Sequence, residues 1–576
     1  MARFQPIIES FTTGEISPIL LGRVSAEQYR SSCKTMENAL PDSHGGVKRR
    51  PGTYFVNEVK DSTKKTRLIP FVVSREESYV IEMGHNYMRF YTEQGQIQSG
   101  GSAYEIATPW GENDIADVHF AQVNDLMYMV HDGYNPRKLT RTSSTSWAIS
   151  QPTLAGSSWN GNADGHANGF PRTTCFFEQR LWLGGTVSEP NTLWASKVGD
   201  FENFTIPGSP AADDPVEYTI AAYTKDTIQW LSPAEVLFIG TTANEHRLAP
   251  NSYISATTVP DVTRQSSYGS RHIQPQYIGA NTIFVQGSGR QVRTFSRNIR
   301  AAAEIYESLD LTWLNEHVSF GGILEISYSQ IPDSILWAIR ADGTLLSMTY
   351  DPALGETPFD ALGWSRHTMD GTCKSVVTIP RATSDETWII VERTISSVVK
   401  KYIEFFDTSK YTDSSLTYDG SAATSITGLA HLNGKSVNIV ADGAVHPAKT
   451  VAGGSVTLDY SANIVHIGLP VIPKLIPVEI EGGIPSGTSQ GLPKRWVTCK
   501  LRLFQSALPK INGIRPADRT PASPMSAVEP LVTGDSLHYN LGHSKAGEIE
   551  ITQDLPVAMH ILAVFGDMTV SAGGGA

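Results

Sequence analysis

The apolar positions of this chain fall into short runs of β type that are interrupted by tight turns. Residues 333–350 (DSILWAIRADGTLLSMTY) give the clearest example, since an apolar run is followed by an Ala-Asp-Gly turn and a second, alternating run. An Asp-Gly pair between two such runs favours a hairpin, because the turn needs a positive φ that glycine adopts at little cost. The pattern therefore predicts a two-stranded hairpin over this stretch.

Similar hairpins recur along the chain at nearly even spacing. Their first strands begin about 47 to 55 residues apart, at Tyr79, Leu126, Leu181, Val236, Ile283, Leu336 and Trp388. The second strands begin at Met88, Arg137, Thr192, His246, Val292, Leu345 and Tyr402. A period near 50 residues with several strands per repeat is typical of propeller blades, which stack radially because one blade cannot bury both of its faces.

The expected fold class is therefore all-β, with a β-propeller-like domain of about six to seven blades at residues 71–410. The alternative is an irregular multi-sheet protein, since any all-β chain contains a hairpin every few dozen residues. Residues 1–70 hold no convincing blade and are expected to form an extended N-terminal arm, with a short helix at residues 25–37 that Ser25 caps. Closely spaced strands with Asn-Gly and Asp-Gly turns predict an additional C-terminal β-rich domain at residues 411–576.

The formal net charge of −12 is unevenly distributed. Residues 1–70 contain 11 Lys and Arg against 7 Asp and Glu, whereas the rest of the chain contains 35 against 51. An acidic body does not hold nucleic acid by counterion release, but it could line a passage through which DNA slides without adhering. The more basic first part suits an element that docks on an acidic partner.

The sequence gives no sign of membrane insertion, export or disulfide bonding. No run of 18 apolar residues is present, so no membrane-spanning segment is expected, and the N-terminus lacks the apolar core and cleavage site of a signal peptide. The cysteines lie more than a hundred residues apart, which excludes a CxxC metal site and predicts packed thiols in a protein made in a reducing cytoplasm: Cys33, Cys175, Cys373 and Cys499.

The search for chemistry finds no catalytic, cofactor-binding or metal-binding motif. Residues 428–436 (GLAHLNGKS) resemble a phosphate loop, but five residues separate the glycines and no helix follows, so a hairpin turn is favoured. Residues 383–388 (TSDETW) are a partial Asp-box without its glycine or a second copy. The sequence leaves open a pair of carboxylates of the glycosidase type. The residues by themselves therefore give almost no support for an enzyme, a cofactor or a metal site.

A short basic run at Lys48, Arg49 and Arg50 stands in a turn that precedes a strand. Such a run invites a nucleic-acid interpretation. Three basic residues are, however, more typical of a solvated rim or of a salt bridge to an acidic neighbour, and this second interpretation is favoured.

A series of motifs runs in order along almost the whole chain. They are residues 11–18 (FTTGEISP), 21–23 (LGR), 46–53 (GVKRRPGT), 67–71 (RLIPF), 120–131 (FAQVNDLMYMVH), 136–139 (PRKL), 179–181 (QRL), 196–200 (SKVGD), 267–269 (SYG), 333–337 (DSILW) and 428–437 (GLAHLNGKSV). In their order and spacing they resemble the tail nozzle family, or tail tubular protein B, of short-tailed bacteriophages (podoviruses).

The resemblance implies a structural protein of the virion tail without catalytic residues. Members of this family form a homo-hexameric tube with a propeller-like domain, docked below the dodecameric adaptor (head-to-tail connector) ring under the portal. The tube retains the packaged viral dsDNA, conducts it during ejection without sequence-specific binding, and carries tail fibre or tailspike proteins. The expected location is the virion tail, after assembly in the host bacterial cytoplasm.

Under this resemblance the N-terminal arm becomes the expected docking element toward the adaptor or a neighbouring subunit. The candidate interface residues are Gly14, Glu15, Arg23, Lys48, Arg49, Arg50 and Pro51. Two other functions stay open. One is a glycan-degrading or glycan-binding propeller of a tail spike, and the other is a monomeric propeller that serves as a binding hub.

Overall fold

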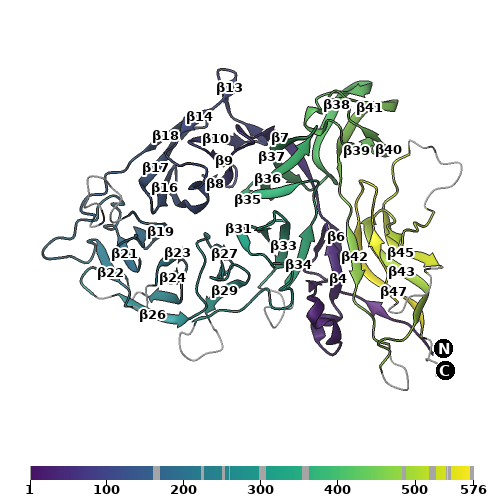
Figure 1. Cartoon of the computed structure of the whole chain (residues 1–576), viewed down its shortest axis with the longest axis horizontal. Coiled ribbons are helices and arrows are strands. Elements are labelled where there is room, and N and C mark those ends of the chain that lie inside the picture. Colours follow the sequence, from purple (N-terminus) through teal and green to yellow (C-terminus); the bar gives the residue numbers. More distant parts are fainter. Residues whose placement is uncertain are drawn as a thin grey trace.

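The computed structural model describes residues 2–157, 159, 169–221, 226–249, 253–258, 260–297, 306–352, 362–482, 488–517, 524, 527–539, 541 and 547–570. These residues form an all-β protein in which a ring of small sheets lies beside two further groups of strands (Figure 1). The helical elements of the described part are four short 3-10 helices, η1 (Pro18–Gly22), η2 (Glu27–Tyr29), η3 (Ile115–Asp117) and η4 (Ala430–Leu432).

Blades 1 to 4 of the ring are antiparallel sheets whose strands follow one another along the chain. Blade 1 contains β8 (Arg67–Val72), β9 (Ser78–Gly84), β10 (Tyr87–Thr92), β11 (Gly95–Gln96) and β14 (Glu105–Ala107), with the hairpin of β12 (Gln98–Ser99) and β13 (Ser102–Ala103) between them in sequence. Blade 2 contains β15 (His119–Val123), β16 (Leu126–His131), β17 (Tyr134–Ser143) and β18 (Ser146–Ser150). Blade 3 contains β19 (Thr173–Phe177), β20 (Arg180–Gly184), β21 (Thr192–Ala195) and β22 (Val216–Thr219). Blade 4 contains β23 (Ile228–Pro233), β24 (Leu237–Thr241), β25 (Glu245–Ala249) and β26 (Asp261–Ser266).

Blades 5 to 7 complete the ring, and the last two are parts of larger sheets. Blade 5 contains β27 (Gln276–Ile278), β28 (Asn281–Val285), β29 (Val292–Arg297) and β30 (Tyr306–Glu307). Blade 6 contains β31 (Ile323–Ser329), β32 (Ile335–Arg340), β33 (Leu345–Tyr350) and β34 (Leu362–His367). Blade 7 contains β35 (Thr372–Pro380), β36 (Asp385–Ile395), β37 (Val398–Asp407) and β7 (Gly52–Glu58).

The seven hairpins predicted from the sequence are the second and third strands of the seven blades. In β32 and β33, for example, Trp337 lies opposite Ser347. The second strand is covered on both faces by neighbouring blades, so every side chain of β9 and of β24 is buried. This two-sided burial explains why these strands appear in the sequence as continuous apolar runs. The prediction of an all-β propeller is confirmed by the sheet order of the chain.

The ring closes through a strand from the N-terminal part of the chain. The innermost strands surround the axis, and β35 of blade 7 packs against β8 of blade 1. The outer strand of blade 7 is β7, which pairs antiparallel with β37. The boundary predicted at residue 70 is therefore wrong, because residues 52–58 belong to the propeller. Their partner strand follows some 350 residues later, and local patterns do not show such a pairing.

The rest of the N-terminal part pairs with C-terminal strands to form a sandwich. Its first sheet contains β1 (Ala2–Phe4), β2 (Ile7–Ile8), β5 (Ala39–Pro41), β6 (Val47–Arg49), β43 (Lys494–Ser506), β45 (Val532–Tyr539) and β47 (His560–Val570). The second sheet continues from blade 6 through β3 (Gly14–Glu15), β4 (Ser32–Glu37), β42 (Lys474–Pro477), β46 (Ile551–Thr552) and β44 (Lys510–Ile511). Met36, Val47, Trp496 and Val564 lie in the core between them.

Two expectations for the N-terminal part are wrong. It is not an extended arm, because its strands are built into the sandwich. Residues 25–37 do not form a helix either, since η2 makes a single turn and β4 then pairs with β42. Cys33 and Met36 of β4 are fully buried, and their packing in the sandwich core outweighs the local capping signal at Ser25.

The predicted C-terminal domain consists of two parts. The first is a module of β38 (Thr412–Ile426), β39 (Ser436–Ala441), β40 (Ala444–Thr450) and β41 (Val456–Pro470), which extends the sheet of blade 7 and has its own core. The second part is the C-terminal half of the sandwich. Propeller, module and sandwich therefore meet where blade 7 ends, at the segment that precedes β7.

Candidate functional site

Most residues predicted to dock on a partner are buried in the fold. Gly14 and Glu15 form β3, which runs parallel to β34 of blade 6 and to β4 of the sandwich. A Cβ at Gly14, where φ is +69°, would lie 2.3 Å from the carbonyl oxygen of Trp364. Glu15 is 1% exposed, and its Oε1 lies 2.9 Å from Nε2 of His317 and 2.8 Å from Nη2 of Arg366. These two residues therefore tie the sandwich to blade 6.

The remaining candidates are divided between surface and interior. Arg23 is exposed just after η1, and Pro51 is half-buried. The half-buried Lys48 pairs with Asp333 of blade 6 at 2.5 Å. Arg49 is 2% exposed, and its guanidinium donates to four backbone carbonyls, those of Tyr411, Val471, Leu555 and Val557. Arg49 thus binds backbone on both sides of the junction between module and sandwich.

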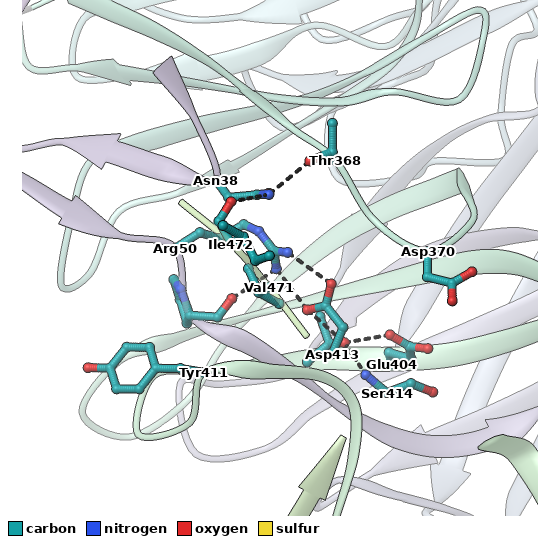
Figure 2. A network of polar contacts seen from close by, with 12 residues as sticks. Asn38, Arg50, Thr368, Asp370, Glu404, Tyr411, Asp413, Ser414, Val471 and Ile472 are labelled. Carbon is teal, nitrogen blue, oxygen red and sulfur yellow. Dashed lines mark hydrogen bonds and ion pairs between the residues drawn. The ribbon is translucent and has the colours of Figure 1, made fainter. Parts of the chain in front are cut away.

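Arg50 lies at the point where the three parts of the chain meet (Figure 2). Its Nη1 donates to Oδ1 of Asp413 at 3.0 Å, and its Nη2 donates to Oδ2 at 2.9 Å. The two side chains are 0% and 2% exposed. Asp413 belongs to β38, so this bidentate pair joins the module to the segment between sandwich and propeller. Paired donors in this geometry are among the strongest hydrogen bonds that proteins form.

A second buried ion pair continues this contact into blade 7. Glu404 of β37 and Arg393 of β36 are both fully buried, with Nη2 of Arg393 at 3.0 Å from Oε2 of Glu404. The hydroxyl of Thr53 in β7 donates to the same Oε2 at 2.5 Å, and it accepts from the amide of Ser414 at 2.8 Å. Burial by itself disfavours the charge on Arg393, but Glu404 outweighs it and raises the pKa of the guanidinium.

We call this group the interlock and define it as Arg49, Arg50, Thr53, Arg393, Glu404 and Asp413. A buried ion pair adds little net stability, because removing both charges from water costs about as much as their attraction returns. Breaking such a pair is expensive, however, since one charge then stays buried without a partner. The interlock therefore fixes one relative position of propeller, module and sandwich.

The sequence favours a solvated rim or a salt bridge for the basic run, and the salt bridge is confirmed for Lys48 and Arg50. Sequence reasoning missed the other half of the interlock. The available signal was a charged residue inside an apolar strand pattern, as with Glu404 in YIEFF and Arg393 in VERTI, because charged residues are rarely fully buried unless they are paired.

The axis of the propeller holds a second polar cluster. Arg67 of β8 pairs with Glu325 of β31 at 3.1 Å, and Oε2 of Glu325 accepts from the hydroxyl of Ser375 and the amide of Val376 in β35. The hydroxyl of Ser375 also accepts from the amide of Leu68 in β8 at 2.9 Å. Blades 1, 6 and 7 are thereby joined at their innermost strands.

Beside this cluster lies an axial cavity of about 710 Å³. Its lining includes Arg67, Phe120, Ile273, Glu325, Tyr328 and Lys374. This volume falls in the range of small-molecule pockets. Gln274, which precedes β27 of blade 5, donates to the carbonyl of Phe120 in β15 of blade 2 across the axis, so the centre of the propeller is not an open channel.

The described residues contain no candidate metal centre. Among them, no group of three or more His, Cys, Asp or Glu side chains is placed to hold a metal ion. The four cysteines are buried and unpaired. Residues 428–436, whose sequence resembles a phosphate loop, contain η4 and a turn before β39, and Lys435 pairs with Asp370 at 2.9 Å. None of the helical segments in the described ranges is long and apolar enough to cross a membrane.

Comparison with known proteins leaves the family open. No protein-family model matches the chain. No curated protein matches it either.

Similar solved structures are propellers at low identity. The WD40 domain of Neurospora crassa Pan2 is 10% identical over 62% of this chain and 95% of that chain, with a TM-score of 0.33. The β-propeller domain of Myceliophteria thermophila Cps50 (Swd1) is 10% identical over 61% and 99%, with a TM-score of 0.37. The WD40 domain of Doa1 is 10% identical over 62% and 97%, with a TM-score of 0.35. The propeller assignment rests on the sheet order of this chain itself.

The interlock predicts that a substitution of Asp413 strongly lowers the stability of the fold. We expect Asp413→Ala to lower the free energy of unfolding by about 3–5 kcal/mol, because Arg50 stays buried without its partner. Denaturant titration measures this loss. The matched control is Asp535→Ala, which breaks a bidentate pair with Arg502 whose side chains are 51% and 41% exposed, and should cost about 1 kcal/mol or less.

The double variant Arg50→Met with Asp413→Leu should recover much of the lost stability, since neither charge of this pair then stays buried without its partner. Equal losses for Asp413→Ala and Asp535→Ala would show that the buried pair has no special role.

Buried histidines predict acid sensitivity. His466 lies between the hydroxyls of Thr412 and Thr417, at 2.8 and 3.0 Å, and burial lowers its pKa to about 4. In the unfolded chain it takes up a proton near pH 6.5. Its contribution is therefore complete above pH 6.5 and is lost as the pH falls toward 4, by about 3 kcal/mol.

We expect His466→Gln to be less stable than the native chain at pH 7 but to lose about 3 kcal/mol less between pH 7 and 4. Unfolding free energies at both pH values test this difference. Equal losses in His466→Gln and in the native chain would contradict the assignment.

Proposed function

We propose that this chain is a structural virion protein, the tail nozzle of a short-tailed bacteriophage. Six copies form a tube below the portal and its adaptor ring, retain the packaged dsDNA and conduct it during ejection. The tube lies in the virion tail and carries fibre or tailspike proteins. In this proposal the protein is not an enzyme, and its work is mechanical.

The observation that carries the proposal is the place of the motifs that resemble the nozzle family. Residues 46–53 (GVKRRPGT) supply Arg49, Arg50 and Thr53 to the interlock. Residues 11–18 (FTTGEISP) supply Gly14 and Glu15 to the contact with blade 6. The motifs that carry the resemblance therefore join propeller, module and sandwich into one body. A tube wall that holds packaged DNA needs such a body, because hinges within a subunit would let the ring deform.

The charge of the chain supports the same role. The propeller axis is not an open channel, so the DNA passage of the proposed tube runs between the six subunits and along their outer surfaces. Residues 71–576 contain 35 Lys and Arg against 51 Asp and Glu. A wall of this charge repels phosphates and avoids the salt-dependent adhesion of a basic wall.

The arm proposed to dock on the adaptor needs revision in this light. Glu15, Arg49 and Arg50 are engaged within the chain, so they do not serve as contacts to a partner. The exposed Arg23, beside η1, stays a candidate for contact with the adaptor or a neighbouring subunit.

A second candidate function is glycan recognition by a tail-spike propeller. The observation that favours it is a cavity of about 380 Å³ between blades 6 and 7 and the sandwich. Aromatic side chains and one neutralised ion pair line it, namely Trp337, Tyr411, Phe504, Lys48 and Asp333. Such a mixture suits a small ring with polar edges.

Electron cryo-microscopy of virions that contain the chain tests the proposal. The expected result is a six-fold ring of this chain directly below the portal and adaptor, with the propellers at its periphery. Finding the chain in peripheral spikes, or not in the virion at all, would overturn the proposal. Release of reducing sugar from host polysaccharide by the purified chain would favour the glycan-degrading alternative.

A further inference from the structure

The segment that leads into blade 5 crosses the propeller axis. The amide of Ser270 donates to the carbonyl of Thr241 in blade 4, and the amide of Arg271 donates to that of Val285 in blade 5. Gln274 then reaches the innermost strand of blade 2, where its Nε2 donates to the carbonyl of Phe120 at 2.9 Å and its Oε1 accepts the Phe120 amide at 3.4 Å. Blades 2 and 5 are separated by two blades, so the segment spans the axis. We call residues 270–276 the axial strap.

A pair of stacked imidazoles holds the middle of the strap. The ring of His272 lies on that of His119 in β15, with centroids 4.0 Å apart and planes inclined by 11°. Nδ1 of His272 lies 2.7 Å from the carbonyl oxygen of Gln229 in blade 4, and Nε2 lies 3.1 Å from that of Asp117. This one ring therefore touches backbone of blade 4 and backbone that leads into blade 2.

His119 is the buried partner of this pair and is 2% exposed. Its Nδ1 lies 3.1 Å from the hydroxyl of Thr173 in blade 3, whereas its buried Nε2 has no hydrogen-bond partner in the described part of the chain. A proton added to this ring would create a cation in contact with the second imidazole, and no further acceptor is in place for it. The site therefore suits an uncharged His119.

The charged groups around the pair also oppose protonation. Burial lowers the pKa of His119 well below its ordinary value, and His272, Arg67, Arg172 and His131 add to the shift. Burial followed by Arg172 lowers the pKa of His272, while its two carbonyl partners and the carboxylate of Asp117 act in the opposite direction. Arg67 and Arg172 are themselves paired with Glu325 and Asp132, so burial is the main obstacle to a charge on His119. Both nitrogens of His272 face carbonyl oxygens, which would also accept from a protonated ring, so His119 is the ring whose surroundings exclude a charge.

We infer that the axial strap is an acid-released latch: it covers the propeller axis at neutral pH and detaches from blade 2 when His119 takes up a proton. The driving force is the proton uptake of the detached state, in which an exposed imidazole titrates near pH 6.5. The attached state is favoured above this pH and loses its advantage as the pH falls below it.

Release of the latch would change the axial cavity. Arg271, His272, Ile273 and Gln274 are part of its lining, so detachment of the strap removes one wall and joins the cavity to the space between blades 2 and 5. The blades themselves need not move, because the cluster of Arg67, Glu325 and Ser375 joins blades 1, 6 and 7 without the strap. The latch is therefore a local switch within a closed ring.

Hydrogen–deuterium exchange of the full chain at pH 7 and pH 5, corrected for intrinsic exchange rates, tests the latch. In the native chain, the amides of Ile273 and Phe120, which donate to the Arg271 carbonyl and to the Gln274 side chain, should be protected at pH 7 and exchange at least about tenfold faster at pH 5, while β32 stays protected. Gln274→Ala, which removes both bonds to Phe120, should give fast strap exchange already at pH 7.

The titrating group is tested by His119→Phe, which keeps a stacked ring without a charge, and by His119→Gln, which keeps an uncharged polar group beside Thr173. Either variant should reduce the acid response of the strap to less than about threefold, and the second keeps the test open if the first does not fold. His466→Gln is the matched control for a buried histidine elsewhere and should keep the full response. A strap that stays protected at pH 5 in the native chain, or that opens equally in both variants, would overturn the inference.

Discussion

The architecture of this protein depends on a buried contact between residues 49–53 and residues 393–413. The last blade lacks an outer strand of its own, and residues 52–58 supply it after the chain has left the sandwich. Arg50 and Thr53 flank this crossing point and bind Asp413 and Glu404 in an interior from which water is excluded. Buried charges are tolerated only when they are paired, so this contact fixes the relative positions of the segments that it joins.

The interlock therefore leaves no hinge at the junction of propeller, module and sandwich. Blade 6 continues into the sandwich, blade 7 continues into the module, and the interlock links the sheet of blade 7 and the module to β6 of the sandwich. Continuous hydrogen-bonded sheets and a shared buried network couple the parts more tightly than the polar surfaces that usually separate domains. A rigid subunit of this kind can form part of a tube wall. Protonation of His119 would change only the strap at the propeller axis.

The sequence predicted what is local and missed what is distant. The hairpins from Tyr79 to Tyr402 were visible because turn chemistry and two-sided burial act over a dozen residues. The roles of β3, β4, β6 and β7 were not visible, because their partners lie hundreds of residues away and short strands have weak patterns of their own. Arg49 and Arg50 were recognised as unusual, but no pattern shows that Asp413 and four carbonyls lie beside them. His272 could not be recognised, since its partners come from blades 2 and 4.

Differential scanning calorimetry at neutral pH tests the central claim most directly. If the interlock makes one body of propeller, module and sandwich, the chain should unfold in a single transition whose calorimetric and van't Hoff enthalpies agree. Two well-separated transitions in the native chain, one for the propeller and one for the sandwich, would show that the parts fold independently and would contradict the account.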